Sequence, residues 1–195
     1  MTTPAADARP LSLVLIGGSL RAGSVNSAAL AVAAETCPAG ARAFIYARMG
    51  DLPHFNPDDD RDPLPETVAE MRALLAAADA VLLSTPEYAG SLPGSFKNLL
   101  DWTIGGGSLD RLPVGWLNPS THDGARDTYA ALRIVLDRAG ANVVAEACVD
   151  VPIRRDAIGP DGRIDAPDIR AAIATAMVEL SNAARIRRET MAAES

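Results

Sequence analysis

Lysine is nearly absent from this sequence, since Lys97 is the only one among 18 basic residues. Acidic residues number 25, and the formal net charge is -7 at pH 7. This balance argues against nucleic acid and against anionic membrane surfaces as partners, because both repel an acidic protein. An anionic ligand must therefore be held locally, by the N-terminus of a helix or by a well-placed arginine.

Cysteine is also scarce, and the two residues Cys37 and Cys148 lie far apart in no CxxC pattern. A disulfide framework or a zinc site is not expected, and the thiols suit a reducing, cytoplasmic setting. No apolar run approaches the roughly 18 residues that a membrane-spanning helix needs. The opening MTTPAADARP lacks the basic and apolar parts of a signal peptide, and we expect residues 1–10 to form a disordered tail.

What the chain does contain is a regular alternation of strand and helix patterns over 195 residues, 48% of them hydrophobic. Short apolar segments, typical of strands buried on both faces, lie at 11–17, 41–47, 79–85, 113–118 and 141–149. Segments with helical periodicity lie at 27–35, 66–78, 94–104, 124–140 and 166–189. Strand and helix patterns thus alternate about five times along the chain.

This alternation predicts an α/β fold in which helices cover both faces of a parallel sheet. Five strands favour a flavodoxin-like three-layer sandwich with a five-stranded parallel sheet over the six-stranded dinucleotide-binding fold. Residues 11–190 contain no repeat and no linker, so we expect a single domain there. Such sheets bind ligands beyond the carboxyl ends of their strands, where the strand order reverses.

The loop after the first strand, GGSLRAGSVN, gathers glycines, hydroxyls and an amide ahead of a helix. Free N–H groups at a helix N-terminus bind anions, and Ser19, Ser24 and Asn26 can donate to phosphate oxygens. Arg21 can add charge-assisted hydrogen bonds. The loop is neither GxGxxG nor a Walker A sequence, and its many donors suit a terminal phosphate monoester. The alternative is that Ser24 or Asn26 simply caps the helix.

The third strand ends in STPEYAGSLPGSFKNLLDW (residues 84–102), where prolines stiffen a loop before the next helix. A stiff loop loses less entropy when it binds a ligand. The alternative is a plain helix-entry turn, with Pro93 in the first helical turn. Asn98, Asp101 and Trp102 lie well along that helix, and we expect them in the core or at a subunit interface.

These two stretches resemble the signature motifs of the NADPH-dependent FMN reductase family, GSxRxxSxN and PEYxxSxPGxxKNxxDW. The order and spacing of the motifs also match, and the strand pattern extends the similarity over nearly the whole chain. The matching residues are Gly18, Ser19, Arg21, Ser24, Asn26, Pro86, Glu87, Tyr88, Ser91, Pro93, Gly94, Lys97, Asn98, Asp101 and Trp102.

The resemblance implies that FMN is the cofactor and that NADPH or NADH donates hydride. It also implies a small-molecule acceptor (flavin, quinone, azo dye or metal oxyanion) and a homodimer or homotetramer. The loop after the third strand would lie along the flavin ring. No acid or base is needed for hydride transfer to the flavin, so we assign no catalytic residue and no metal. The implied cofactor-binding residues are Ser19, Arg21, Ser24, Val25, Asn26, Pro86, Glu87, Tyr88, Ala89, Gly90, Ser91, Ser120, Thr121 and His122.

The loop after the fourth strand, NPSTHDGARD, departs from the SxGxxGG form of the resembled family. Gly124 matches the first of the paired glycines, but Ala125 replaces the second. Pro119 falls where the serine should be, and Thr121 replaces the middle glycine. The departure bears on how the pyrimidine side of the flavin is held.

Two other functions compete with a reductase. A flavin-binding electron carrier or redox sensor would pass electrons to a protein partner, which the acidic loop 58–62 could steer. A flavodoxin-like protein that has lost FMN is the other alternative, and the altered loop after the fourth strand points to it.

Overall fold

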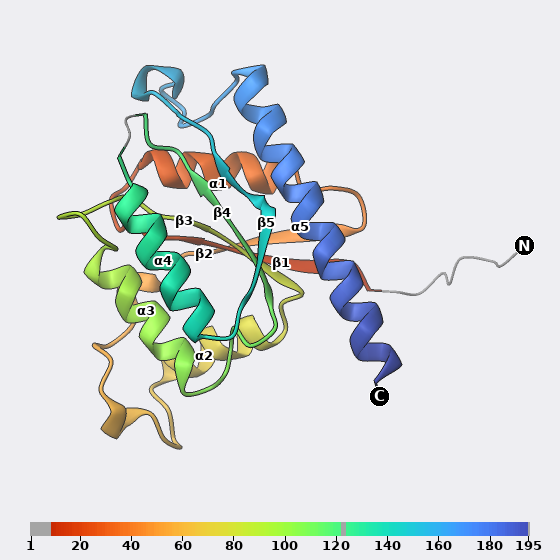
Figure 1. Ribbon diagram of the computed structural model, residues 1–195. Coiled ribbons are helices and arrows are strands. Elements are labelled where there is room, and N and C mark those ends of the chain that lie inside the picture. Colours follow the sequence, from red (N-terminus) through yellow and green to blue (C-terminus); the bar gives the residue numbers. More distant parts are fainter. Residues whose placement is uncertain (1–8, 122–123, 195) are drawn as a thin grey trace, which may run out of the picture.

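The computed structural model describes residues 9–121 and 124–194, and its centre is a five-stranded sheet in the order β2-β1-β3-β4-β5 (Figure 1). All four strand pairs are parallel. This confirms the predicted α/β, flavodoxin-like fold. The strands are β1 (Leu11–Gly17), β2 (Ala41–Tyr46), β3 (Ala80–Ser84), β4 (Pro113–Asn118) and β5 (Asn142–Asp150).

Five α-helices and three short 3-10 helices connect and cover the strands in the described parts of the chain. Within those parts, no helix combines the length and the apolar character needed to cross a membrane. The α-helices are α1 (Val25–Glu35), α2 (Glu66–Ala76), α3 (Gly94–Ile104), α4 (Arg126–Arg138) and α5 (Pro167–Ala193). The 3-10 helices are η1 (Met49–Asp51), η2 (Pro57–Asp59) and η3 (Arg155–Ala157).

Strand β1 shows why the central strands are apolar throughout. Leu13 and Leu15 point into the core that contains α1 and α5, whereas Val14 and Ile16 point into the core that contains α2, α3 and α4. Successive side chains of a strand alternate between faces, so a strand covered on both sides needs apolar residues at every position. These four residues are at most 2% exposed.

The edge of the sheet at which the strands begin, hereafter the amino edge, is closed by ion pairs around Asp79. Arg188 Nη2, from α5, lies 2.5 Å from Asp79 Oδ2, and Arg9 Nη1 lies 3.2 Å from the same oxygen. The Ser12 N–H donates to that oxygen at 2.7 Å. The Asp79 side chain is only 5% exposed. Charge and hydrogen bonds therefore join the start of β3 to α5 and to the chain that enters β1.

The loop between β2 and α2 carries the acidic run noted in the sequence. Asp58 and Asp59 are exposed, but Asp60 pairs with Arg72 of α2 at 2.7 Å, and both side chains are 13% exposed. Part of the acidic run is therefore neutralised within the chain. Asp60 also lies against Gly105, where an added Cβ would fall 1.8 Å from Asp60 Oδ2.

Candidate functional site

The strands end at the opposite edge, hereafter the carboxyl edge, where their loops surround a cleft of about 300 Å³. The strand order reverses there, because β2 lies on one side of β1 and the later strands lie on the other. Open parallel sheets bind ligands at this position. The cleft is lined by Val25, Asn26, Thr85, Pro86, Glu87, Asn118, Pro119, Ser120, Thr121, Gly124, Ala125, Ile153, Arg154 and Arg155.

Ser24 caps α1, because its Oγ accepts a hydrogen bond from the Ser27 N–H at 3.0 Å. The helix therefore begins at Val25 rather than at residue 27, with Ser24 as its N-cap. Val25 and Asn26 are the first two helical residues, so their N–H groups have no acceptor within the helix. Both residues line the cleft, which brings the positive end of the helix dipole to it.

Asn26 ties the first loop to the end of β3. Its side-chain oxygen accepts a hydrogen bond from Ser84 Oγ at 2.9 Å, and the residue is 6% exposed. The side-chain nitrogen of Asn26 makes no hydrogen bond to any described residue. Two amide N–H donors therefore remain for a ligand in the cleft.

Gly18 allows the loops after β1 and β3 to touch. Its N–H donates to the Ser84 carbonyl at 2.8 Å. A Cβ at this position would lie 2.2 Å from Thr85 Oγ1 and 3.0 Å from Phe96 Cγ. Only glycine fits so close to the Thr85 and Phe96 side chains.

The loop between β3 and α3 forms a tight turn. The N–H groups of Tyr88 and Ser91 donate to each other's carbonyl oxygens, at 3.0 and 3.1 Å. Ala89 and Gly90 between them have φ values of 52° and 74°, as a type I′ turn requires. The N–H groups of Tyr88 and Ser91 are thus used within the turn. Tyr88 itself is 51% exposed.

Tyr129 of α4 supports two of the loops from beneath the cleft. Its hydroxyl donates to the Leu117 carbonyl at 2.6 Å and accepts from the Thr85 N–H at 3.2 Å. Burial raises the pKa of Tyr129 far above its ordinary value, so the phenol stays protonated. On the same helix, Thr128 Oγ1 donates to Glu87 Oε2 at 3.3 Å and orients that carboxylate at the cleft.

The loop after β4, hereafter the third loop, is fixed at its start by Asn118. The Asn118 side chain donates to Asp150 Oδ1 at 2.8 Å and accepts from the Ser120 N–H at 3.2 Å. Ala125, which stands where the resembled family has glycine, adopts φ 70° and is 3% exposed. The backbone therefore keeps a glycine-like conformation despite the substitution, and α4 begins at Arg126 rather than at residue 124.

The second half of the PEYxxSxPGxxKNxxDW motif has a structural role. Asn98 Nδ2 and Trp102 Nε1 both donate to the Pro53 carbonyl, at 2.9 and 2.8 Å. Asn98 Oδ1 accepts from the Phe55 N–H at 2.7 Å. The Phe55 ring meets the Trp102 ring edge-on at a centroid distance of 4.9 Å. These residues hold the loop after β2 against α3, and Trp102 is 0% exposed in the core.

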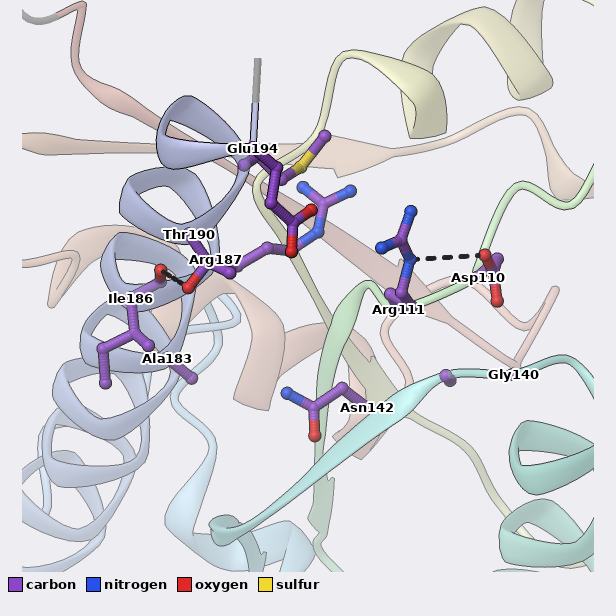
Figure 2. Close-up of a pocket in the computed structure, with 11 residues that line it drawn as sticks. Asp110, Arg111, Gly140, Asn142, Ala183, Ile186, Arg187, Thr190 and Glu194 are labelled. Atoms are coloured by element: carbon purple, nitrogen blue, oxygen red, sulfur yellow. Dashed lines mark hydrogen bonds and ion pairs between the residues drawn. The ribbon is translucent and has the colours of Figure 1, made fainter.

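A larger cavity of about 550 Å³ lies at the amino edge, between the C-terminal part of α5 and the segments that enter β4 and β5 (Figure 2). Arg187 of α5 and Glu194, which caps the end of that helix, border it on one side, and Arg111 and Asn142 border it on the opposite side (Figure 2). None of the described residues predicted to bind FMN lines this cavity. Its place at the amino edge separates it from the loops that carry the motifs.

The structure places the predicted residues in two groups. Those that line the cleft are Val25, Asn26, Pro86, Glu87, Ser120 and Thr121. Those in the same loops but outside the lining are Ser19, Arg21, Ser24, Tyr88, Ala89, Gly90 and Ser91. His122 lies outside the described residues.

Sequence reasoning missed several residues of the lining, above all Arg154 and Arg155 after β5. The only signal in the sequence is the pair of arginines that follows the fifth strand. Ile153 brings both arginines to the cleft, because it is buried and its N–H donates to the Pro119 carbonyl at 3.1 Å. The other missed residues are Thr85, Asn118, Pro119, Gly124 and Ala125.

Comparison with known proteins gives a consistent picture. A family model described as NADPH-dependent FMN reductase matches residues 11–154. An NAD(P)H-dependent FMN reductase from Pseudomonas aeruginosa is 42% identical over 87 residues, which cover 45% of this chain and 46% of the relative. A quinone reductase from Escherichia coli (strain K12) is 34% identical over 104 residues, which cover 53% of this chain and 52% of the relative. The chain thus spans about half the length of these curated relatives.

Among solved structures, the flavoenzyme NAD(P)H:(acceptor) oxidoreductase FerB from Paracoccus denitrificans matches with a TM-score of 0.79. The two chains are 26% identical, and the match covers 90% of this chain and 97% of that one.

Proposed function

Because the chain belongs to the NADPH-dependent FMN reductase family, we propose that it carries hydride from NADPH or NADH through FMN to a small-molecule acceptor. The observation that carries the proposal is that the cleft meets the N-terminus of α1 at the reversal of strand order. The names of the relatives support a flavin or quinone as acceptor. Azo dyes and metal oxyanions are further candidates.

The first loop suits the phosphate of FMN. Val25 and Asn26 offer N–H groups at the positive end of α1, and the Asn26 side chain adds two N–H donors. We assign Ser19 and Arg21 to the outer side of the phosphate. Ser24 acts through the helix, because its Oγ is engaged with Ser27.

The loops after β3 and β4 suit the flavin ring, which would lie between them. Pro86 and Glu87 face the cleft from one loop, and Ser120 and Thr121 face it from the other. We assign Tyr88, Ala89, Gly90 and Ser91 to the rim beside the ring. FMN, when bound, supplies the hydride chemistry, and the protein supplies position and surroundings.

The rigidity of these loops supports catalysis by orientation. Tyr129 holds the ends of β3 and β4 at fixed separation, and Gly18 holds the first loop against Thr85. Because these loops are already fixed, little further conformational entropy is lost when the hydride donor and the hydride acceptor are aligned between them. The glycine-like conformation of Ala125 also favours a retained FMN site over a lost one.

We further propose a cytoplasmic homodimer or homotetramer, as the family resemblance implies. The buried position of Trp102 removes it from any subunit contact. Light scattering at micromolar concentration tests the assembly, and a monomer would contradict it.

The first test is spectroscopic. FMN is added to the purified protein, the excess is removed, and NADPH is added without oxygen. A retained flavin band that bleaches supports a reductase. A retained band that does not bleach supports an electron carrier. No retained band, together with no turnover of added FMN, contradicts the proposed function.

A pair of variants tests the phosphate end of the site. Asn26→Asp keeps the acceptor for Ser84 Oγ but places a negative charge at the cleft, so FMN should bind at least about tenfold more weakly. Asn182→Asp is the matched control, because Asn182 is exposed on α5 and makes a comparable hydrogen bond with Arg185 at 3.1 Å. Equal FMN affinity in both variants would contradict the assignment of Asn26.

A further inference from the structure

The segment that leaves β5 is held beside the end of β4 by backbone hydrogen bonds. The N–H groups of Val151 and Ile153 donate to the carbonyls of Asn118 and Pro119, at 2.9 and 3.1 Å. Val151 and Ile153 are 4% and 2% exposed, so they anchor the segment in the core. The residues that follow are therefore fixed at the cleft rather than on a remote loop.

Arg154 and Arg155 come next and line two adjoining spaces. One is the cleft, and the other is an outer hollow of about 680 Å³ whose remaining lining residues are Thr121, Pro152 and Asp156. Thr121 and the two arginines belong to both linings, so cleft and hollow meet at these side chains. A molecule seated over the cleft can extend into the hollow at this point.

The two arginines differ in how their charge is used. Arg154 is neutralised by Asp156, with Nε 3.0 Å from Oδ1 and Nη2 2.7 Å from Oδ2. The Arg155 guanidinium makes no ion pair and no hydrogen bond to any described residue. In a chain of net charge -7, this places at the cleft a positive charge that no described carboxylate pairs with. Such a charge attracts anions locally against the overall field.

We propose that Arg155 binds the phosphate or carboxylate group of the co-substrate that exchanges electrons with FMN. A guanidinium can donate two parallel hydrogen bonds to either group. The phosphate of FMN is assigned to the N-terminus of α1 in the first loop, so Arg155, on the segment after β5, remains for a second anion. That anion belongs either to the nicotinamide dinucleotide or to an acidic acceptor.

The inference rests on the proposed function for its place in the reaction, but binding by Arg155 is measurable without turnover. Adenosine 2′,5′-bisphosphate and adenosine 5′-monophosphate are titrated calorimetrically into the full chain with FMN present. The variants are Arg155→Gln, Arg154→Gln and Asp156→Asn. Arg138→Gln, an exposed change at the end of α4, is the control for lost positive charge.

If the anion belongs to the dinucleotide, Arg155→Gln should weaken binding of the bisphosphate about tenfold. Arg154→Gln should have a smaller effect, because Asp156 already occupies that guanidinium. Asp156→Asn should strengthen binding about threefold, because it frees Arg154. Arg138→Gln should leave binding unchanged, and all variants should keep the wild-type melting temperature because the altered side chains are exposed.

Kinetics then identify the source of the anion. If Arg155→Gln raises the KM for NADPH but not for NADH, the group that Arg155 binds is the 2′-phosphate of NADPH. If the KM rises equally for both dinucleotides, the group is the diphosphate that they share. A KM raised only for a carboxylated quinone, relative to a neutral one, assigns the acceptor. The proposal is overturned if Arg155→Gln changes neither bisphosphate affinity nor any of these KM values, or if Arg138→Gln causes equal losses. A chain that binds the bisphosphate through Arg155 but never reduces FMN would contradict the proposed function and not this assignment of anion binding.

Discussion

At the carboxyl edge of the sheet the loops meet through close backbone contacts and left-handed turns, whereas at the amino edge the chain is closed by the ion pairs around Asp79. Gly18, Ala89 and Ala125 shape the first edge by steric fit and backbone conformation. Arg188 and Asp79 close the second edge with charges that satisfy each other. The edge with the cleft therefore presents the N–H groups that begin α1 and a guanidinium, that of Arg155, which no described residue pairs with. At the other edge, Arg188 is held by Asp79 and contributes to stability.

The largest effect is expected from Gly18→Ala at the carboxyl edge. The new methyl group would lie 2.2 Å from Thr85 Oγ1 and 2.6 Å from Thr85 Cβ, which the packed loops cannot accept without moving. We expect a loss of about 3 kcal/mol in the free energy of unfolding, together with weaker FMN binding. Urea denaturation and a flavin titration measure the two effects.

Gly94→Ala is the control for this change. An added Cβ at Gly94 has no neighbour within 4 Å, and the residue begins α3 with no positive φ. We expect no loss of stability, because alanine favours a helix more than glycine does. Equal destabilisation by the two substitutions would contradict the steric account of Gly18.

A smaller effect is expected from Arg188→Gln at the amino edge. The change removes the 2.5 Å contact with Asp79 and the 2.6 Å hydrogen bond to the Arg9 carbonyl, and it leaves a buried carboxylate with less compensation. We expect a loss of about 2 kcal/mol in the free energy of unfolding. Arg9→Gln should cost only about 0.5 kcal/mol, because the Arg9 side chain is 62% exposed. FMN affinity should not change in either variant.

The same cluster predicts a dependence of stability on pH. Burial alone raises the pKa of Asp79, but hydrogen bonds from Arg188 and the Ser12 N–H, with the charges of Arg188 and Arg9, outweigh it and hold the pKa below its ordinary value. A carboxyl with a lower pKa in the folded state stabilises the fold above its unfolded pKa, at about 4. That stabilisation is lost as the pH falls through the folded pKa. Asp79→Asn should therefore flatten the decline of unfolding free energy below about pH 4.

The smallest effect, of opposite sign, is expected from Ala89→Gly. Ala89 holds φ 52° on an exposed turn, so glycine should relieve strain and stabilise the fold by about 0.5–1 kcal/mol. Ala125→Gly relieves the same kind of strain at φ 70°, but the residue is 3% exposed. The buried methyl group it removes is worth about 0.8 kcal/mol, so the two effects should cancel. An equal gain in both variants would show that burial at Ala125 is unimportant.

Much of the fold was visible in the sequence because strand and helix patterns are local. A strand covered on both faces is apolar throughout, as in β1 and β3, and the predicted segments differ from the observed ones only at their ends. The start of α1 was misjudged, because Ser24 is the N-cap and the helix begins at Val25 instead of at residue 27. The start of α4 was also misjudged, because Ala125 adopts a left-handed conformation, which alanine does not predict, and the helix begins only at Arg126.

The candidate site was visible in part. Asn26, Pro86 and Glu87 belong to motifs that follow β1 and β3, so the position of these motifs could be inferred from the order of the elements. Asn98 and Trp102 belong to the same motif, but they hold the loop after β2 through the Pro53 carbonyl. A motif records which residues occur together and does not separate those that face a ligand from those that hold a loop.

The sequence by itself determined the layered architecture and the gathering of hydroxyl and amide groups in the first loop, because both follow from periodicity and from residue types within a few positions. Only the tertiary structure decided which side chains share the cleft. Arg155 reaches it because the segment after β5 pairs with the end of β4, more than 30 residues earlier in the chain. Whether the Arg155 guanidinium is paired depends on the carboxylates around it, and the neighbouring Asp156 pairs with Arg154 instead. Contacts between residues so far apart are set by packing of the whole domain, which no local pattern encodes.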